Sequence, residues 1–315
     1  MKTKLSMLAV LAAISAPAAA GTIDLGVAGD YNAFIFGDYT ANGNSVAGAL
    51  AIGGNASLNG NSVSNINGND YAVVVGGNLG DTPWGGSANG NLWVGGTNNK
   101  GGNYTISGTL DNPSTAPAPV DFAAAESYLT ALSSGLSNVS ATGSYSPLDE
   151  WNQNSKVFTG SGSGVEFFNL DASEFASFNN LTFNGFSAGT TLVFNVAGSD
   201  AVLGWQWQSL SNDYNVLFNF YEATSVKLEN ATINANILAV NATITGSGNL
   251  YGTVIANQWD NAMTLGNGGF DTVETALFAG VTAAVPEPHD YALLLTGLGV
   301  IGLATARRRK ILARK

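Results

Sequence analysis

Four short phrases decide how this chain folds: Phe34-Ile35-Phe36-Gly37-Asp38, Leu50-Ala51-Ile52-Gly53-Gly54-Asn55, Val73-Val74-Val75-Gly76-Gly77-Asn78 and Leu92-Trp93-Val94-Gly95-Gly96-Thr97. The first glycine of each phrase follows the previous one after 16, 23 and 19 residues, close to one coil of a solenoid. An apolar run followed by a corner that tolerates positive φ calls for this order of residues. We therefore predict a β-helix in which each coil packs against the next. The alternative is a β-sandwich with glycine-rich hairpins.

The same period returns in the second half of the chain. Three more apolar runs end in Asn219, Asn241 and Asn257, at steps of 22 and 16 residues. Stacked coils place such side chains one above another, where their amides pair along a ladder. Because two separate stretches share one period, the predicted fold class is mainly β, a β-solenoid or β-helix.

A helix is predicted between the two repeat regions. It follows a stiff, proline-rich connector at residues 112–119. Asp121 is a candidate N-cap, and apolar residues then recur at spacings of three and four. These residues are Phe122, Ala125, Leu129, Leu132 and Leu136. Such a narrow apolar stripe fits a helix over about 121–138 that lies flat against a sheet face.

The stretch from residue 140 to 215 carries predicted strands and many phenylalanines. The strands are expected at residues 156–159, 165–170, 181–183 and 191–196. Large aromatic side chains dominate packing where they occur, so we expect most of these phenylalanines in the core.

The charge of the chain excludes one class of partner. The 315 residues carry a net charge of −11 and include no Cys. Between residues 21 and 285, three Lys stand against 20 Asp and Glu, which gives this part a charge of −17. Such a body repels phosphates, so nucleic acid is excluded as a partner. The missing Cys excludes disulfides as a source of stability.

The first 20 residues have the pattern of a secretory signal peptide. Lys2 and Lys4 form its basic region, an apolar run follows, and small residues lead to a cleavage site between Ala20 and Gly21. We therefore expect cleavage by signal peptidase. The predicted domains are this signal peptide, a body at residues 21–284 and a C-terminal segment at residues 285–315.

The C-terminal segment has three parts in a fixed order. Val285-Pro286-Glu287-Pro288 comes first, an apolar run at residues 291–306 follows, and Arg307, Arg308 and Arg309 come next. The apolar run is slightly short for a membrane span, and the basic cluster would keep the tail on the cytoplasmic side. In physical terms this is a transmembrane segment that anchors an external body.

This order of parts resembles the PEP-CTERM sorting signal of bacterial proteins. The resemblance implies recognition by an exosortase, transient anchoring in the inner membrane and processing near Pro286-Glu287-Pro288. It also implies delivery to the surface of the cell envelope or to the extracellular matrix, as in a biofilm. A permanent anchor without processing is the alternative.

The start of the body resembles a second family, choice-of-anchor A. The likeness rests on Asn32-Ala33-Phe34-Ile35-Phe36-Gly37-Asp38 and on the stretch from Val46 to Asn55. That family comprises exported bacterial surface proteins, which implies a structural or adhesive role. An extracellular polysaccharide or a host or matrix protein is then the expected partner. The resemblance supplies no catalytic residue.

The chemistry available to the body is narrow. Between residues 21 and 285 there is neither His nor Cys, so Ser-His-Asp triads, Cys-His pairs and His-based metal sites are impossible there. We therefore predict no catalytic residue, no cofactor and no metal. Paired carboxylates leave one alternative, a carbohydrate-active enzyme on a β-helix. The acids concerned are Asp149, Glu150, Glu166, Asp171, Glu174, Asp200 and Asp213.

Tryptophans supply the candidate ligand surface. In Gly204-Trp205-Gln206-Trp207-Gln208, the alternation of a strand would place Trp205 and Trp207 on one face. Exposed indoles stack on sugars, whereas buried ones belong to the core, and the sequence favours the core. The predicted function is an exported, non-enzymatic surface protein of structural or adhesive type.

Overall fold

The computed structural model describes residues 21–41, 43–210, 214–261, 264–266 and 281–283. The chain divides into two compact units, and the larger one comprises residues 22–283. The predicted signal peptide, residues 1–20, and the predicted sorting signal, residues 285–315, lie outside the described residues. Within the described ranges, no helix is long and apolar enough to cross a membrane.

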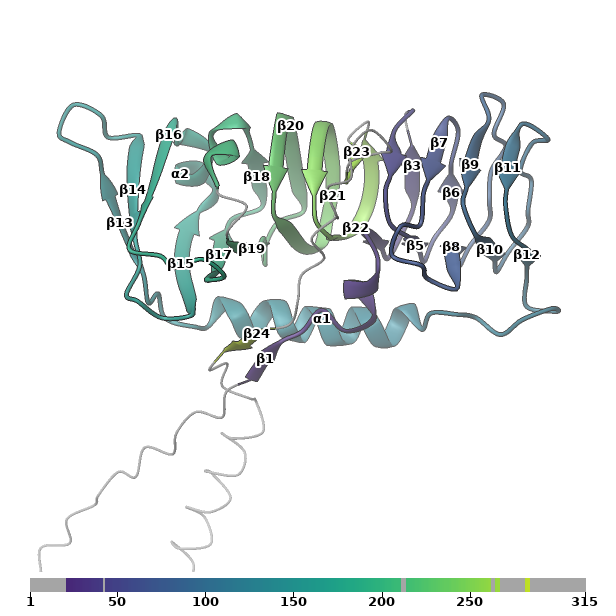
Figure 1. The fold of residues 1–315 in the computed structure, drawn as a ribbon, viewed down its shortest axis with the longest axis horizontal. Helices are drawn as coiled ribbons and strands as arrows, with labels where there is room; N and C mark the ends of the chain where they lie inside the picture. Colours follow the sequence, from purple (N-terminus) through teal and green to yellow (C-terminus); the bar gives the residue numbers. More distant parts are fainter. Residues whose placement is uncertain (1–20, 42, 211–213, 262–263, 267–280, 284–315) are drawn as a thin grey trace, which may run out of the picture. The chain divides into compact units, whose positions relative to one another are not determined.

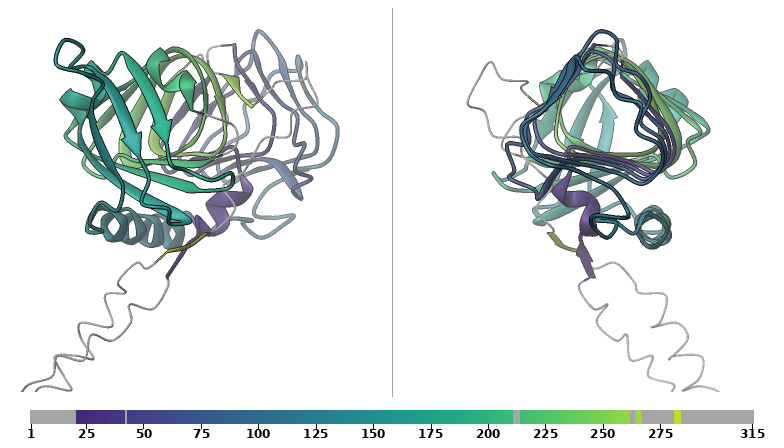
Figure 2. Two further views of the ribbon diagram at one scale, coloured as in Figure 1. Left: turned by 60° about the vertical axis from the view of Figure 1, so that its left-hand side comes forward. Right: turned by 90° about the vertical axis from the view of Figure 1, so that its right-hand side faces the viewer.

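Three-sided coils form this unit, and viewed along the coil axis they outline a rounded triangle (Figure 2, right). Parallel strands join successive coils, and the described strands of the coils form one sheet of 19 strands. Apolar side chains from all three sides fill the inside of the coils. The prediction of a β-solenoid is therefore confirmed.

Each side of the triangle is one face of the solenoid, and the chain passes the three faces in a fixed order. We call them the helix face, which the long helix covers, the middle face, and the hydroxyl face, which carries a row of small polar side chains. The helix face carries β2 (Ala33–Ile35), β5 (Leu50–Ile52), β8 (Tyr71–Val75), β10 (Asn91–Val94), β12 (Leu110–Asp111), β15 (Val165–Asp171), β17 (Thr191–Ala197), β19 (Asn215–Asn219) and the starts of β21 (Asn236–Tyr251) and β22 (Val254–Asn261). The middle face carries β3 (Tyr39–Ala41), β6 (Ala56–Ser57), β18 (Asp200–Leu203), the start of β20 (Ser225–Asn234), the middle of β21 and the end of β22. The hydroxyl face carries β4 (Ser45–Val46), β7 (Asn61–Val63), β9 (Gly86–Ala88), β11 (Tyr104–Ile106), β23 (Thr264–Leu265) and the ends of β20 and β21.

The remaining elements lie around the coils. A separate three-stranded sheet, β13 (Ser144–Pro147), β14 (Ser155–Thr159) and β16 (Asn180–Asn184), closes one end (Figure 1). A two-stranded sheet joins β1 (Gly21–Ile23) to β24 (Val281–Ala283). The helical elements are η1 (Gly26–Asp30), α1 (Phe122–Ser137), α2 (Ala172–Ser177) and η2 (Trp205–Ser209).

The order of the coils in space differs from their order in the sequence. Strand β2, from the first coil, lies between β5 and β22, so the first and last coils are neighbours (Figure 1). From β2 the N-terminal coils step away through β5, β8 and β10 to β12. The C-terminal coils return through β15, β17, β19 and β21 to β22. The first coil thus packs against the next one, as predicted, and in addition against the last one through the contact of β2 with β22, which we call the seam.

The glycines of the repeated phrases allow the coil backbones to approach closely. A Cβ on Gly76 would lie 2.5 Å from the carbonyl oxygen of Gly53, and a Cβ on Gly77 would lie 2.6 Å from that of Gly54. None of these four glycines has a positive φ. The predicted reason for them, a corner in the left-handed region, is therefore wrong. The requirement for glycine comes from the stacking of one corner on the next.

Polar ladders run along the solenoid, but of the asparagines named from the sequence only Asn219 belongs to the one described first. Asn195 donates from Nδ2 to Oδ1 of Asn169, and Asn219 donates from Nδ2 to Oδ1 of Asn195, each at 2.9 Å. The predicted stacking of Asn219 on Asn241 does not occur, because the register pairs Asn219 with Leu238. A second ladder in the N-terminal coils joins Asp38, Asn55 and Asn78.

Helix α1 covers the helix face, as predicted. Its N-cap is Asp121, whose side chain accepts a hydrogen bond from the backbone N–H of Ala124. Its first residue, Phe122, packs on Phe34 of β2 with ring centroids 5.2 Å apart. At its other end, the carbonyl oxygen of Leu136 accepts a hydrogen bond from Asn195 of β17. One helix thus contacts N-terminal and C-terminal coils on both sides of the seam.

Aromatic side chains fill the solenoid near its closed end. The four strands predicted here correspond to β14, β15, β16 and β17. Phe158 is fully buried and contacts a set of rings on neighbouring strands and helices. This set comprises Tyr145, Phe168, Phe178, Phe183, Phe194 and Trp207. The expectation of an aromatic core is confirmed.

Candidate functional site

The two tryptophans of the predicted ligand surface do not share a face. They lie on η2, a short 3-10 helix, so the predicted strand is wrong. Trp207 is 0 % exposed and stacks on Phe175 at 4.6 Å between ring centroids. Trp205 is 58 % exposed. One turn of helix places successive tryptophans on different sides, so only Trp205 remains as a surface candidate.

Trp205 lines a shallow pocket on the outside of the solenoid. The pocket has a volume of about 410 Å³, and Lys227, Glu229, Gly246 and Ser247 also line it. Lys227 Nζ lies 2.7 Å from Glu229 Oε1, and both side chains are exposed. Gly246 has a φ of 114°, and a Cβ there would lie 1.9 Å from the carbonyl oxygen of Leu228. The pocket therefore combines an indole, a charged pair and a backbone position that excludes side chains.

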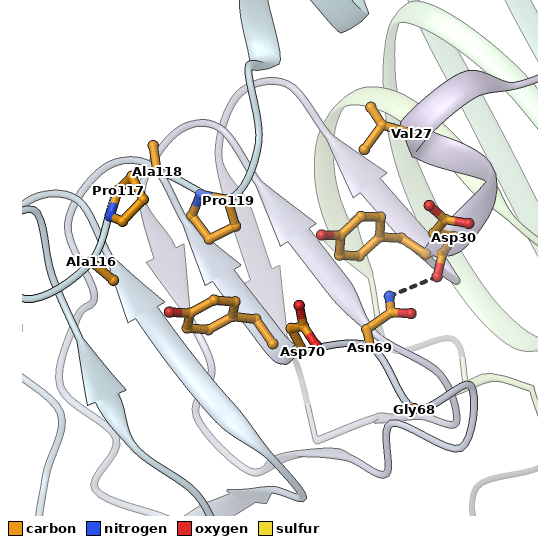
Figure 3. A pocket seen from close by; sticks show the side chains of 11 residues that line it. Val27, Asp30, Gly68, Asn69, Asp70, Ala116, Pro117, Ala118 and Pro119 are labelled. Atoms are coloured by element: carbon orange, nitrogen blue, oxygen red, sulfur yellow. Dashed lines mark hydrogen bonds between the residues drawn. The ribbon is translucent and has the colours of Figure 1, made fainter.

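A second, larger pocket lies on the N-terminal coils and is shown in Figure 3. Its volume is about 520 Å³. Three segments far apart in the sequence line it: η1 with Tyr31, the loop that leads into β8, and the connector before α1. We call it the tyrosine pocket; its lining residues are Val27, Asp30, Tyr31, Gly68, Asn69, Asp70, Tyr71, Ala116, Pro117, Ala118 and Pro119.

A row of small polar side chains crosses the hydroxyl face in register. Its members alternate with apolar residues that point into the core, such as Val46, Val63 and Leu265. All members are partly or fully exposed. In spatial order the hydroxyl row is Thr232, Asn249, Thr264, Ser45, Ser62, Ser87 and Thr105. Thr243 and Thr245 lie instead on the middle face, where Lys227 and Asp260 flank Thr245.

The carboxylates considered for catalysis hold local structure together. Glu174 pairs with Lys156 at 2.9 Å and accepts a hydrogen bond from the Tyr145 hydroxyl. Burial, together with this contact with Glu174, raises the pKa of Tyr145 to about 12. Asp171 caps α2, and the hydrogen bonds that it accepts from the Ser173 hydroxyl and the Ser173 backbone N–H lower the pKa of Asp171.

Asp149 and Glu166 also bind backbone groups. Asp149 accepts hydrogen bonds from the backbone and side chain of Asn152, which hold its pKa below the ordinary value. Glu166 is buried and accepts hydrogen bonds from Thr142, Ser161 and Ser163. Asp213 lies outside the described residues.

Most of the residues predicted to act in export and sorting lie outside the part of the chain that the structure describes. The processing residues Val285, Pro286, Glu287 and Pro288, the cluster Arg307, Arg308 and Arg309, and the cleavage-site residue Ala20 lie outside the described residues. Within the part of the chain that the structure describes, no group of three or more His, Cys, Asp or Glu is arranged to hold a metal ion.

Sequence reasoning did not find the tyrosine pocket or the hydroxyl row. The pocket joins segments around residues 30, 70 and 117, and no local pattern links them. The row passes through the seam, where Thr264 lies beside Ser45. Only knowledge of the coil order could have revealed either feature.

Comparisons with known proteins give the family of the chain. Residues 24–272 match the family described as "Putative Ice-binding-like adhesive domain". The crystal structure of an ice binding protein from an Antarctic biological consortium is 16 % identical, with 78 % of this chain and 90 % of that chain covered and a TM-score of 0.31. No curated protein matches the sequence. Because the family match spans most of the chain, this protein belongs to the family of ice-binding-like adhesive domains.

Proposed function

We propose that this protein is an exported adhesive module, displayed at a bacterial cell surface or in the extracellular matrix, that binds extracellular polysaccharide. The pocket at Trp205 carries the proposal. Family membership supports the adhesive part, because the family is described as an adhesive domain. The choice-of-anchor A likeness of the N-terminal coils supports display on a surface.

The Trp205 pocket suits a saccharide on chemical grounds. An exposed indole offers a flat apolar surface on which the C–H face of a sugar ring can stack. Lys227 and Glu229 supply a donor and an acceptor for sugar hydroxyls beside it. Gly246 leaves the floor of the pocket open, since the register places it against Leu228 without a side chain.

Retention on immobilised polysaccharides tests the proposal. The full chain is applied to a panel that includes cellulose, chitin and alginate, and the Trp205→Ala variant is compared on each polysaccharide retained. We expect affinity to fall about tenfold, as for a central aromatic contact. Trp151→Ala is the matched control, because Trp151 is 85 % exposed and lines neither the Trp205 pocket nor the tyrosine pocket. Equal losses of affinity in both variants would contradict the proposal. So would binding of the full chain to immobilised host or matrix proteins but to none of the polysaccharides.

The same incubations decide between adhesion and the alternative, a carbohydrate-active enzyme. An adhesive module leaves the polysaccharide intact. Release of reducing or unsaturated ends by the full chain would overturn the non-enzymatic reading, and Glu166 and Glu174 would then be the first acids to replace.

Sorting through the C-terminal segment is part of the proposal. Its support is the order of Pro286-Glu287-Pro288, the apolar run and the arginine cluster in the sequence. Signal peptidase and an exosortase would then be partners during export. Replacing the three residues with alanine should leave the full-length form in the inner membrane, as seen by fractionation and mass spectrometry. Normal release of that variant would remove the processing proposal.

A second candidate function is binding to ice, and the hydroxyl row favours it. The row lies on parallel strands, whose spacing of about 4.8 Å repeats from coil to coil. A flat, regular surface of small polar groups can order water along it. Ser62→Tyr would place a bulky ring in the row, and Ser57→Tyr on the middle face is the control. Ice growth that the full chain slows and Ser62→Tyr alone restores would establish this function, and no effect of the full chain on ice would exclude it.

A further inference from the structure

The tyrosine pocket is a second site, separate from the one at Trp205. It lies between η1, the loop at Gly68–Asp70 and the connector at Ala116–Pro119 (Figure 3). Its volume of about 520 Å³ is large enough for a small organic group. None of the functions proposed above uses it.

The walls of the pocket combine negative charge with apolar surface. Asp30 and Asp70 line it, and among the described residues neither carboxylate has an ion pair or a hydrogen bond. None of the described Lys residues lines the pocket. The other walls are Val27, Gly68, Asn69, the two tyrosines and the alanines and prolines of the connector. The site therefore offers charge to a cation and contact area to a methylene chain.

Tyr31 is the polar group most deeply enclosed at this site. Its side chain is 7 % exposed and packs edge-on against Phe34, and its hydroxyl has no hydrogen-bond partner among the described residues. Burial, with Asp30 and Asp70 close by, raises the pKa of Tyr31 to about 12. The hydroxyl is therefore neutral at physiological pH.

Hydrogen bonds fix all three walls in place. Asn69 Nδ2 donates to the carbonyl oxygen of Asp30 at 2.8 Å, which ties the loop to η1 (Figure 3). The Tyr71 hydroxyl donates to Asp111 Oδ2 at 3.1 Å. Trp93 Nε1 donates to the carbonyl oxygen of Ala116 at 3.2 Å, which holds the connector. A site with walls already fixed loses little entropy when it binds.

We propose that the tyrosine pocket binds an alkylammonium group. The ammonium would lie between Asp30 and Asp70 and against the tyrosine rings, where both charge and cation–π attraction favour it. The methylene chain would lie along Val27 and the prolines. A lysine side chain of a partner peptide and a free diamine share this chemistry.

Calorimetric titration of the full chain tests the proposal and separates the two sources. The probes are cadaverine and a lysine peptide blocked at both ends, and the same peptide with norleucine is the uncharged comparison. We expect binding of at least one amine and none of the norleucine peptide. Affinity should rise as the salt concentration falls. Cadaverine alone would identify a diamine site, and the blocked peptide would identify a lysine side chain.

Charge-matched variants separate the pocket from the overall negative charge of the body. Asp30→Asn and Asp70→Asn should each weaken amine binding about tenfold. Asp200→Asn removes the same charge from the middle face, does not touch the pocket, and should leave affinity unchanged. Thermal unfolding of each variant checks that it is folded. Equal effects of all three variants would overturn the proposal, as would displacement of the amine by low concentrations of Ca²⁺.

Failure of this proposal is distinguishable from failure of the polysaccharide proposal. Trp205→Ala should leave amine binding unchanged, because Trp205 does not line the tyrosine pocket. Loss of amine binding in that variant would contradict the assignment of the amine to this pocket.

Discussion

At the scale of single residues, buried polar groups are satisfied in ways that a sequence does not reveal. Glu166 is the clearest case: it is buried, and one carboxylate oxygen accepts hydrogen bonds at 2.6 Å from Ser161 N, 2.8 Å from Ser161 Oγ and 3.1 Å from Ser163 N. The other oxygen accepts from Thr142 Oγ1 at 2.7 Å. An acid that looked available for catalysis instead organises the turn before β15.

The pH dependence of stability should report this role of Glu166. Burial alone would raise the pKa of Glu166, but the hydrogen bonds outweigh it and hold the pKa below the ordinary 4.5. The unfolded chain therefore binds the proton more readily than the folded one. The stabilisation is complete above about pH 4.5 and is lost as the pH falls through the folded-state pKa.

Glu166→Gln should lower the free energy of unfolding at pH 7 by about 2 kcal/mol, because charge-assisted hydrogen bonds are lost. The difference from the original chain should shrink as the pH falls below 4.5. Urea unfolding at several pH values measures both effects. Glu126→Gln, at an exposed position on α1, is the control. A loss that stays constant down to pH 2 would refute the assignment to the ionised form.

At the scale of elements, α1 holds together coils that come from distant parts of the chain. Ser133 is the twelfth residue of α1 and is buried against β19. Its hydroxyl donates to Asn219 Oδ1 at 2.6 Å, and Asn219 Nδ2 donates back to the Ser133 carbonyl oxygen at 2.9 Å. Asn219 also continues the ladder to Asn195, so the helix is bonded to the ladder itself.

Ser133→Ala should lower the free energy of unfolding by about 1 to 2 kcal/mol, since it leaves a buried amide oxygen without its donor. Ser134→Ala, one position along and exposed, should have almost no effect. Thermal and urea unfolding of the two variants provide the comparison. Equal stability of both variants would show that the helix is held by apolar packing alone.

The helix was largely predictable from the sequence, because its start and its buried side depend on residues that are close together in the chain. The N-cap at Asp121 and the stripe through Leu129 and Leu136 are visible in the sequence, and the helix begins and ends close to the predicted residues. The segment at Trp205 misled because alternation of Trp and Gln also fits one turn of 3-10 helix. Partners of the ladders were not predictable, since any Asn at a corner is an equal candidate until the register is known.

At the scale of the whole molecule, the seam determines how the two sets of coils depend on each other. The repeated phrases predict that coils exist, but they carry no label that says which coil stacks on which. β2 pairs with β22 because Phe34, Ile255 and Leu238 lie side by side in register. Their buried side chains form one apolar row that points out of the coils toward α1. The coil order is therefore a property of the packed structure, and the period alone could not supply it.

Phe34→Ala should destabilise both sets of coils. The ring is fully buried and contacts Phe122, Tyr31 and Phe36, so its loss should cost about 3 to 5 kcal/mol. Hydrogen exchange should then accelerate on both sides of the seam, in β5 and in β22. Leu92→Ala, in a coil far from the seam, should affect mainly the N-terminal coils. Acceleration confined to the N-terminal coils in both variants would contradict the role given to the seam.

The position of the seam has a consequence for how the protein is made. Ribosomes deliver a chain from its N-terminus, and the earliest coils begin to fold first. One flank of β2 nevertheless stays open until β22, more than two hundred residues later, has emerged. A nascent chain that ends before β22 leaves this edge of β2 unpaired, and unpaired strand edges promote aggregation. The fold therefore closes only when synthesis is nearly complete. We expect a truncated product to aggregate or to be degraded, because it exposes the unpaired edge of β2.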